Sequence, residues 1–194
     1  RLLDRAGVDH VPKAAVAVFV GTEFDSTTGR GGEDGTPLRK TPWGEIAWQL
    51  GSRQAFAKVA EHERRFVEPK GDVIRAFLPK DKPCLILMDE IISYVSTYRK
   101  YGYHNCLYNF IQALSETARS LKNVVLVVSI PSSVISYTDA DEADEQRFKH
   151  MLNRVGKAMK MAAHEETSEI IRRRLFEWGG LPAAARRVAA EYAD

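Results

Sequence analysis

The sequence contains three short apolar runs without a charged residue, and these runs limit the possible folds of the chain more than any other feature. They lie far apart in the sequence, at 14–20 (AAVAVFV), 83–88 (PCLILM) and 123–128 (NVVLVV). Their length and their content of branched residues favour strands that are buried on both faces. Stretches with helical spacing separate the runs, so we predict an α/β fold with a mostly parallel sheet.

The stretches outside these runs place apolar residues at helical spacing. The clearest is 105–121, whose apolar residues form one stripe along a helix. We also predict helices at 43–50, 53–66, 71–78, 89–99, 142–155, 165–178 and 182–192. Residues 157–162 (KAMKMA) predict a fourth, short strand, and 21–42, rich in glycine and polar residues, predict a long loop.

Composition and charge exclude several classes of protein. A formal net charge of +2 indicates neither a strongly basic nucleic-acid binder nor an acidic tail. The two cysteines, Cys84 and Cys106, have neither the number nor the spacing of a disulfide framework or a zinc site, which favours a reducing cytoplasm. No apolar run approaches the ~20 residues that a membrane span needs. No signal peptide is visible, since residues 1–10 carry charges throughout. Because the chain starts at an arginine and not at Met, we expect it to be a piece of a longer protein.

Two adjacent acids, Asp89 and Glu90, directly follow the second apolar run. Ligands of α/β sheets bind beyond the carboxyl ends of the strands. In P-loop ATPases an acid at such an end holds Mg²⁺, and a second carboxylate can deprotonate the attacking water. Asp89 would take the first role, through water, and Glu90 the second. The alternative is that Asp89 caps the next helix and Glu90 lies in its first turn.

The third apolar run ends at Ser129, a small polar residue. Taken alone, Ser129 with the Pro-Ser-Ser that begins at 131 is typical of a turn. The order of the motifs is more specific than either part. A run ending in Asp-Glu, an amphipathic helix and a run ending in serine follow one another in the sequence.

With its motifs in this order, the chain resembles the AAA+ ATPase domain of a family of large prokaryotic proteins of unknown function, often encoded near phage-defence or restriction-modification genes. The segments that carry the resemblance are VAVFVGTEFD (16–25), TPWGEIAWQLG (41–51), CLILMDEI (84–91), YNFIQALSETAR (108–119), VVLVVSIP (124–131) and SEIIRRRLFEW (168–178). The resemblance implies a P-loop NTPase-like three-layer sandwich that is incomplete at its N-terminus. It implies a partial AAA+ core at 1–163, a helical segment at 164–194 that begins a lid, and ATP and Mg²⁺ as cofactors of a self-associating parent protein.

The resemblance also assigns roles to individual residues. Asp89 and Glu90 match the Walker B pair, and Ser129 matches sensor 1, which touches the γ-phosphate or the attacking water. The helix at 145–155 lies where related ATPases carry an arginine finger, for which Arg154 is the first candidate and Arg147 the second.

Three consecutive arginines in the C-terminal segment are further candidates. Arg173 and Arg174, with Arg172 before them, would contact the nucleotide from the side of the lid. Because the three side chains of such a run point in different directions, at most one or two could do so. For these arginines and for the finger candidates, a solvated helix face is the alternative.

The chain departs from the family pattern in one respect. A P-loop needs the string G-x-x-x-x-G-K-[ST], whose amides and lysine hold the phosphates, and the sequence contains no such string. In the family this loop would precede Arg1. We therefore expect the isolated chain to bind ATP poorly and not to hydrolyse it.

A second interpretation is an ATPase-like binding module without catalysis that contacts nucleic acid or protein. Arg30, Arg39 and Lys40 in the long loop could meet nucleic acid, although a mobile loop without such a role explains them better. The segment 98–104 (YRKYGYH) mixes bases with aromatics, as surfaces that stack on single strands do.

A third interpretation is a metal-dependent nuclease or phosphatase that uses the acidic pair directly on a metal. It would need further carboxylates at other strand ends, for which Glu23 and Asp25 are the candidates. The sequence is compatible with DNA, RNA or protein as the substrate of the parent protein.

Overall fold

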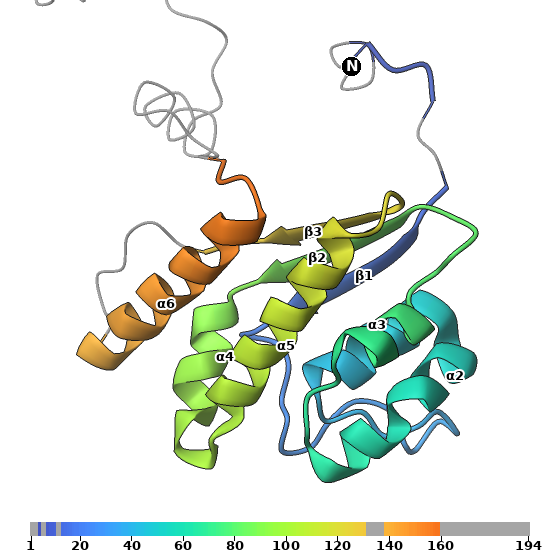
Figure 1. Ribbon diagram of the computed structural model, residues 1–194. Helices are drawn as coiled ribbons and strands as arrows, with labels where there is room; N and C mark the ends of the chain where they lie inside the picture. The colour runs from blue at the N-terminus through green and yellow to red at the C-terminus, as the bar shows by residue number, and fades with distance from the viewer. Residues whose placement is uncertain (1–3, 5–6, 11–12, 131–137, 160–194) are drawn as a thin grey trace, which may run out of the picture. The chain divides into compact units, whose positions relative to one another are not determined.

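The computed structural model describes residues 4, 7–10, 13–130 and 138–159 (Figure 1). The chain divides into two compact units, Arg1–Lys157 and Ala158–Asp194. All strands and helices of the described residues belong to the first unit, which has an α/β fold.

The three predicted strands exist and form one parallel sheet. β1 (Ala15–Val20), β2 (Cys84–Asp89) and β3 (Val124–Val128) lie in that order, with β2 in the middle. In this register Val20 pairs with Asp89. Helices connect the strands, as crossovers between parallel strands require. The predictions of an α/β fold and of a parallel sheet are confirmed.

The helices fall on the predicted helical stretches, with shifted ends. They are α2 (Pro42–Arg65), α3 (Gly71–Phe77), α4 (Ile91–Tyr98), α5 (Tyr103–Arg119) and α6 (Asp139–Val155), with a 3-10 turn, η1 (Arg99–Tyr101), between α4 and α5. The break predicted between 43–50 and 53–66 is a kink inside α2. There Gly51 (φ −156°, ψ 25°) and Ser52 (φ 50°, ψ −141°) leave the helical conformation.

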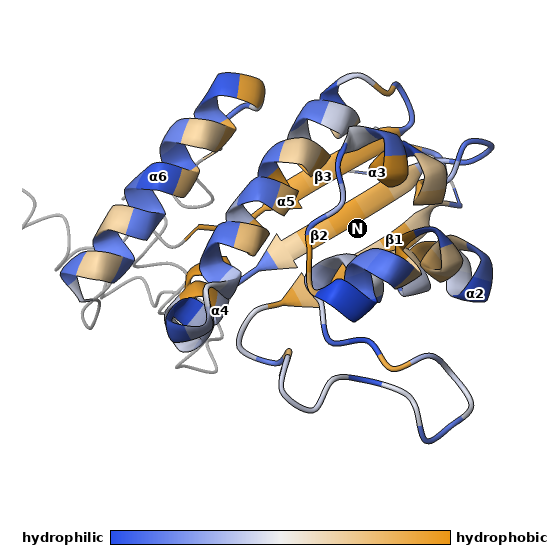
Figure 2. Cartoon of the chain, turned by 60° about the horizontal axis from the view of Figure 1, so that its bottom comes forward, coloured by the Kyte–Doolittle hydropathy of each residue, from blue (hydrophilic) through white to orange (hydrophobic). Residues whose placement is uncertain are grey.

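One face of the sheet is covered by helices and forms the core (Figures 1 and 2). Ala17 of β1 and Ile86 of β2 are fully buried on this face. Trp43 of α2 and Phe110 of α5 pack edge to face, with ring centroids 5.7 Å apart, and are equally buried. Burial of this apolar surface is the main source of the fold's stability.

The other face of the sheet is uncovered within the described residues. Val16, Val18, Val125 and Val127 expose 46%, 41%, 56% and 48% of their surface. Successive side chains of a strand point to opposite faces, and helices cover only one of them. The prediction that the strands are buried on both faces is therefore wrong for the described residues. These residues supply two layers, and the third layer implied by the resemblance is not among them.

The predicted fourth strand is wrong where the structure describes it. Residues 157–159 form neither strand nor helix. They follow Gly156, which ends α6 with an extended backbone and donates its N–H to the Leu152 carbonyl at 2.8 Å. None of the three described strands pairs with these residues, so no ladder fixes an extended conformation. The remaining residues of that prediction, and the helices predicted at 165–178 and 182–192, lie outside the described residues.

Candidate functional site

The carboxyl ends of the three strands lie at one edge of the sheet and bring the predicted residues Asp89, Glu90 and Ser129 to that edge. Gly21, directly after β1, donates its N–H to the Asp89 carbonyl at 2.9 Å. Ser129, directly after β3, donates its N–H to the Met88 carbonyl at 2.8 Å. The end of β2 is therefore held from both sides by the neighbouring strands, and the acidic pair sits in the middle of the edge.

Asp89 is the last residue of β2 and is exposed. Its neighbour Met88 is buried in the core, so the alternation of the strand places the Asp89 side chain on the uncovered face. Its Oδ1 accepts the Glu90 N–H at 2.9 Å. Within the described part of the chain, neither an ion pair nor any other hydrogen bond involves this carboxylate.

Glu90 connects β2 to α4 in an unusual conformation. Its φ of 53° and ψ of 35° are left-handed, a conformation that is unfavourable for any residue with a Cβ. Glu90 itself is the N-cap of α4, and no side chain caps this helix. The alternative in which Asp89 caps the helix and Glu90 lies in its first turn is therefore wrong. Asp89 belongs to the strand, and the Glu90 carboxylate makes neither a hydrogen bond nor an ion pair with the described residues.

Ser129 lies on the same face of the sheet as Asp89. Val125 and Val127 of β3 are exposed on the uncovered face, and the alternation continues to Ser129, which is also exposed. The hydroxyl and the Asp89 carboxylate thus lie on adjacent strands, at the same end and on the same face. The sequence order that suggested a common site corresponds to a common location.

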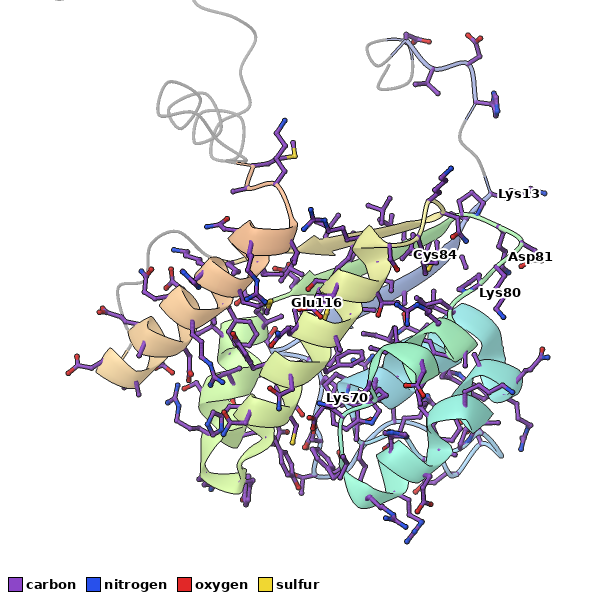
Figure 3. All side chains as sticks on the ribbon, viewed as in Figure 1. Lys13, Lys70, Lys80, Asp81, Cys84 and Glu116 are labelled. Carbon is purple, nitrogen blue, oxygen red and sulfur yellow. The ribbon has the colours of Figure 1, made fainter. Side chains whose placement is uncertain are left out.

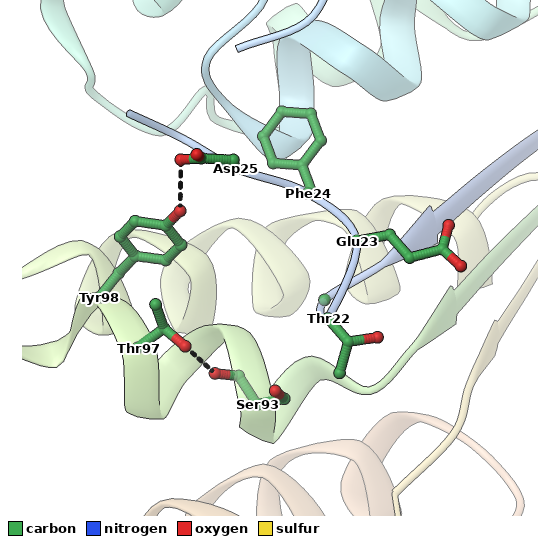
Figure 4. A pocket seen from close by; sticks show the side chains of 8 residues that line it. Thr22, Glu23, Phe24, Asp25, Ser93, Thr97 and Tyr98 are labelled. Carbon is green, nitrogen blue, oxygen red and sulfur yellow. Dashed lines mark hydrogen bonds between the residues drawn. The ribbon is translucent and has the colours of Figure 1, made fainter. Parts of the chain in front are cut away.

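A hollow of about 190 Å³ lies beside the end of β1, between the loop that follows β1 and α4 (Figure 4). Eight residues line it: Gly21, Thr22, Glu23, Phe24, Asp25, Ser93, Thr97 and Tyr98. The Tyr98 hydroxyl donates to Asp25 Oδ1 at 2.9 Å and accepts the Ser26 N–H at 2.9 Å. The Ser26 hydroxyl in turn lies 2.7 Å from that of Tyr94. Two tyrosines one helical turn apart on α4 therefore fix this loop.

Asp25 and Glu23, the two further carboxylates predicted for a directly bound metal, lie in the loop that follows β1. Hydrogen bonds lower the pKa of Asp25 to about 2, first that from the Thr27 N–H and then that from Tyr98. Hydrogen bonds from its own loop and from α4 thus account for Asp25. Glu23 is exposed at the rim of the hollow. In the described part of the chain, no group of three or more His, Cys, Asp and Glu side chains could hold a metal ion.

The two finger candidates lie on α6 and contact α5. Arg147 donates to Asn105 Oδ1 at 3.0 Å, and its guanidinium lies 3.8 Å from the centroid of the Tyr108 ring. Arg154 is 3.5 Å from Glu116, which Figure 3 labels on α5. Both arginines are exposed and lie on the same helix, as predicted, and their role stays a prediction. Arg173 and Arg174 lie outside the described residues.

Two of the three basic residues named in the long loop, Arg30 and Arg39, form ion pairs with Glu45 of α2. Arg39 is 7% exposed, and its Nε donates to Glu45 Oε2 at 2.8 Å. Arg30 lies 3.4 Å from the other oxygen of the same carboxylate, and the backbones of Arg30 and Arg39 pair as a short antiparallel bridge. The expectation that Arg39 could meet nucleic acid is wrong, because its side chain is buried against Glu45.

The aromatic segment at 98–104 is largely packed. Tyr98 is 6% exposed, and Tyr103 stacks on Phe66 with ring centroids 3.7 Å apart. Of the tyrosines of this segment, Tyr101 is the exposed one, with Lys100 lying 4.9 Å from its ring centroid. One exposed ring is a small surface for stacking bases.

Sequence reasoning missed the ion pairs that fix α6. Arg99, after α4, donates to Asp141 Oδ1 at 2.7 Å and to Asp144 Oδ2 at 2.8 Å. Asp141 also completes a capping box with Thr138 at the start of α6. The T-x-x-D string was a readable signal for the cap. No local pattern indicates that Arg99 reaches it from 42 residues earlier.

Comparison with known proteins finds one family. A model described as the DUF499 N-terminal domain matches residues 32–167, more than half of the chain. This segment includes the acidic pair, Ser129 and both finger candidates. Neither the curated proteins nor the solved structures contain a match to the chain. Among the described residues, no helix is both long and apolar enough to cross a membrane.

Proposed function

The chain belongs to the DUF499 N-terminal domain family, whose description names no reaction. We therefore propose a function from the residues that lie at the carboxyl edge of the sheet. The chain is part of an ATP-binding and hydrolysing AAA+ type module of a larger protein. The observation that carries this proposal is the placement of Asp89, Glu90 and Ser129 at the carboxyl ends of two adjacent parallel strands. In parallel sheets this is where phosphate ligands and their metal ions bind.

The residues present fit a magnesium ion that is held mainly by water and phosphate. Mg²⁺ keeps several waters and takes only one or two protein carboxylates in nucleotide sites. Asp89 offers an exposed carboxylate with one oxygen free of hydrogen bonds to the described residues. Asp89 would hold the ion through water, and the ion would neutralise charge on the terminal phosphates.

Glu90 would act on the attacking water. A general base needs a carboxylate that is free to accept a proton, and no described cation is paired with that of Glu90. Ser129, on the strand beside Asp89, would donate a hydrogen bond to the γ-phosphate or hold the same water. An arginine of α6, Arg154 or Arg147, would reach the phosphates of a neighbouring copy of the protein.

The groups that grip the phosphates would come from outside the described residues. The sequence has no G-x-x-x-x-G-K-[ST] string. Asp89 and Ser129 point to the uncovered face of the sheet, so a phosphate-binding loop would approach from that side. Asp89, Glu90 and Ser129 would thus be the water-activating half of a nucleotide site.

A second candidate function is an interaction module that never hydrolyses ATP. The uncovered apolar face, with Val16, Val18, Val125 and Val127, favours it, because exposed contiguous apolar surface marks interaction sites. In that case Asp89 and Glu90 would serve a contact with a basic protein or hold the connection between β2 and α4.

Titration calorimetry with ATP and Mg²⁺ distinguishes the two candidates. The 194-residue chain should bind weakly, and a longer piece of the parent protein that includes a phosphate-binding loop should bind tightly. Asp89→Asn in the longer protein should weaken binding with Mg²⁺ more than binding without it. Tight binding by the short chain would contradict the proposal that the groups that grip the phosphates come from elsewhere in the longer protein. No binding by the longer protein would favour the interaction module.

A further inference from the structure

Gly21, the first residue after β1, lies directly against the backbone of Glu90. A Cβ atom on Gly21 would lie 2.1 Å from the Glu90 carbonyl oxygen, 2.9 Å from its carbonyl carbon and 3.0 Å from Tyr94 Cβ. Non-bonded carbon atoms at their optimal separation are about 3.5–4 Å apart. No side chain fits at position 21 unless its neighbours move.

Glycine is needed here for space and not for its backbone freedom. Gly21 is not among the residues with positive φ, so its φ does not by itself require glycine. The three atoms nearest to an added Cβ belong to Glu90 and Tyr94. Tyr94 is 1% exposed, and its hydroxyl is bonded to Ser26, so this residue is fixed in the core. Glu90 is half-buried and is the neighbour that would move.

The direction of the Glu90 side chain depends on the atoms that Gly21 touches. Glu90 is left-handed, a conformation that a residue with a Cβ keeps only when its surroundings hold it. The helix that follows is anchored by Ile91 and Ile92, both fully buried. With the helix fixed, a displaced Glu90 carbonyl changes the Glu90 backbone angles and turns its Cα–Cβ bond.

We propose that Gly21 is a positioning residue, whose missing side chain keeps Glu90 left-handed and so aims the Glu90 carboxylate. Gly21 touches no reactant and acts through Glu90. The kinetic consequence of this inference rests on the proposed ATPase function, whereas its structural consequence does not.

The structural consequence is tested on the 194-residue chain with Gly21→Ala. The backbone chemical shifts of Glu90 and the three-bond coupling constant between its amide and α protons should no longer be those of a left-handed residue. The chemical shifts of β1 and α5 should stay unchanged. Gly71→Ala is the matched control, because its φ is not positive and the nearest atom to an added Cβ lies 3.2 Å away. A folded Gly21→Ala protein with a left-handed Glu90 would overturn the inference.

A double variant decides the matter if Gly21→Ala alone does not fold. Glycine adopts either hand of the backbone at little cost. Adding Glu90→Gly should therefore restore folding, because the backbone at 90 can then shift freely. Failure of Glu90→Gly to rescue Gly21→Ala would show that the conflict lies elsewhere and would also overturn the inference.

The kinetic consequence is measured in the longer ATP-binding protein. Gly21→Ala should lower kcat about 10–100-fold, as expected when a general base is misplaced, and should leave ATP affinity nearly unchanged. Gly71→Ala should keep the wild-type kcat. Unchanged kcat in Gly21→Ala would overturn the positioning role. Absence of ATPase activity in the wild type would instead refute the proposed function, and the NMR result would still decide the structural claim.

Discussion

The side chain of Gln49 on α2 pairs with the backbone of Val18 as a neighbouring strand would. Its Oε1 accepts the Val18 N–H at 2.7 Å, and its Nε2 donates to the Val18 carbonyl at 2.9 Å. The same Nε2 donates to Glu45 at 2.8 Å, which joins this cap to the buried Arg39–Glu45 pair. One amide thus occupies the outer edge of β1, where unpaired backbone groups would otherwise invite another strand.

Replacing Gln49 should weaken the fold and expose this edge. Because a typical hydrogen bond contributes about 1 kcal/mol net, Gln49→Ala should lower the free energy of unfolding by about 1–3 kcal/mol. Urea unfolding measures the change, and analytical ultracentrifugation should show more self-association. Gln54→Ala, on the same helix but exposed, should change neither quantity. Equal effects of the two substitutions would show that the edge cap has no energetic role.

The interactions at the start of α6 should stabilise the fold at neutral pH and less so in acid. Burial raises the pKa of Asp141, but the hydrogen bonds from Arg99 and then Thr138 outweigh it and lower that pKa to about 2, from an ordinary 3.8. As the pH falls, the unfolded chain therefore takes up this proton before the folded one does. The contribution of Asp141 to stability should be complete above about pH 4 and lost towards about pH 2.

Asp141→Asn tests this assignment. The variant should be less stable than the wild type at neutral pH, and the difference in free energy of unfolding should shrink as the pH falls from 4 to 2. Asp139→Asn, in the same helical turn but exposed, is the matched control and should lower the free energy of unfolding at neutral pH less than Asp141→Asn does. A constant difference between Asp141→Asn and wild type across this range would contradict the assignment.

Gly44 at the start of α2 makes room for the half-buried carboxylate of Glu63, from the end of the same helix. Glu63 accepts hydrogen bonds from the Lys40 N–H and the Thr41 hydroxyl, and a Cβ on Gly44 would lie 2.0 Å from Glu63 Oε2. Gly44→Ala should therefore destabilise the fold by about 1–3 kcal/mol through overpacking. In a Glu63→Ala background the same substitution should cost clearly less, and additive effects in this double-mutant cycle would refute the contact.

The two faces of the sheet should respond differently to substitution. Val127 is 48% exposed, so Val127→Thr, which keeps the branched shape, should change the free energy of unfolding by less than about 0.5 kcal/mol. Ile86 is fully buried, so Ile86→Ala should cost about 2–5 kcal/mol. A large cost of Val127→Thr in the 194-residue chain would show that this face is covered in solution.

The strands and most helices could be predicted because their signals are local. Each apolar run contains nearly all residues of its strand, and only Asp89 of β2 lies beyond the run. Gly51 marks the position of the kink in α2. Burial on both faces could not be read from the runs. A run such as VVLVV gives the same pattern whether helices cover one face or two, and Val125 and Val127 turn out exposed.

The candidate site was predictable in its members but not in its geometry. The acids and Ser129 follow apolar runs, and parallel pairing then places them at one edge. The left-handed conformation of Glu90 was not predictable, because nothing in the string Asp-Glu-Ile calls for it. It depends on Gly21, which lies 69 residues earlier and touches Glu90 only after the strands pair. The Arg99 ion pairs depend on tertiary packing in the same way.

The most direct test of the central claim is the rate of ATP hydrolysis by the longer protein with and without Glu90→Gln. The control is Glu61→Gln, an exposed acid of α2 that is paired with Arg64 and Arg65. If Glu90 activates water, Glu90→Gln should bind ATP as tightly as wild type and hydrolyse it about 10²–10⁴-fold more slowly, while Glu61→Gln retains full activity. Hydrolysis at the wild-type rate by Glu90→Gln would contradict the account.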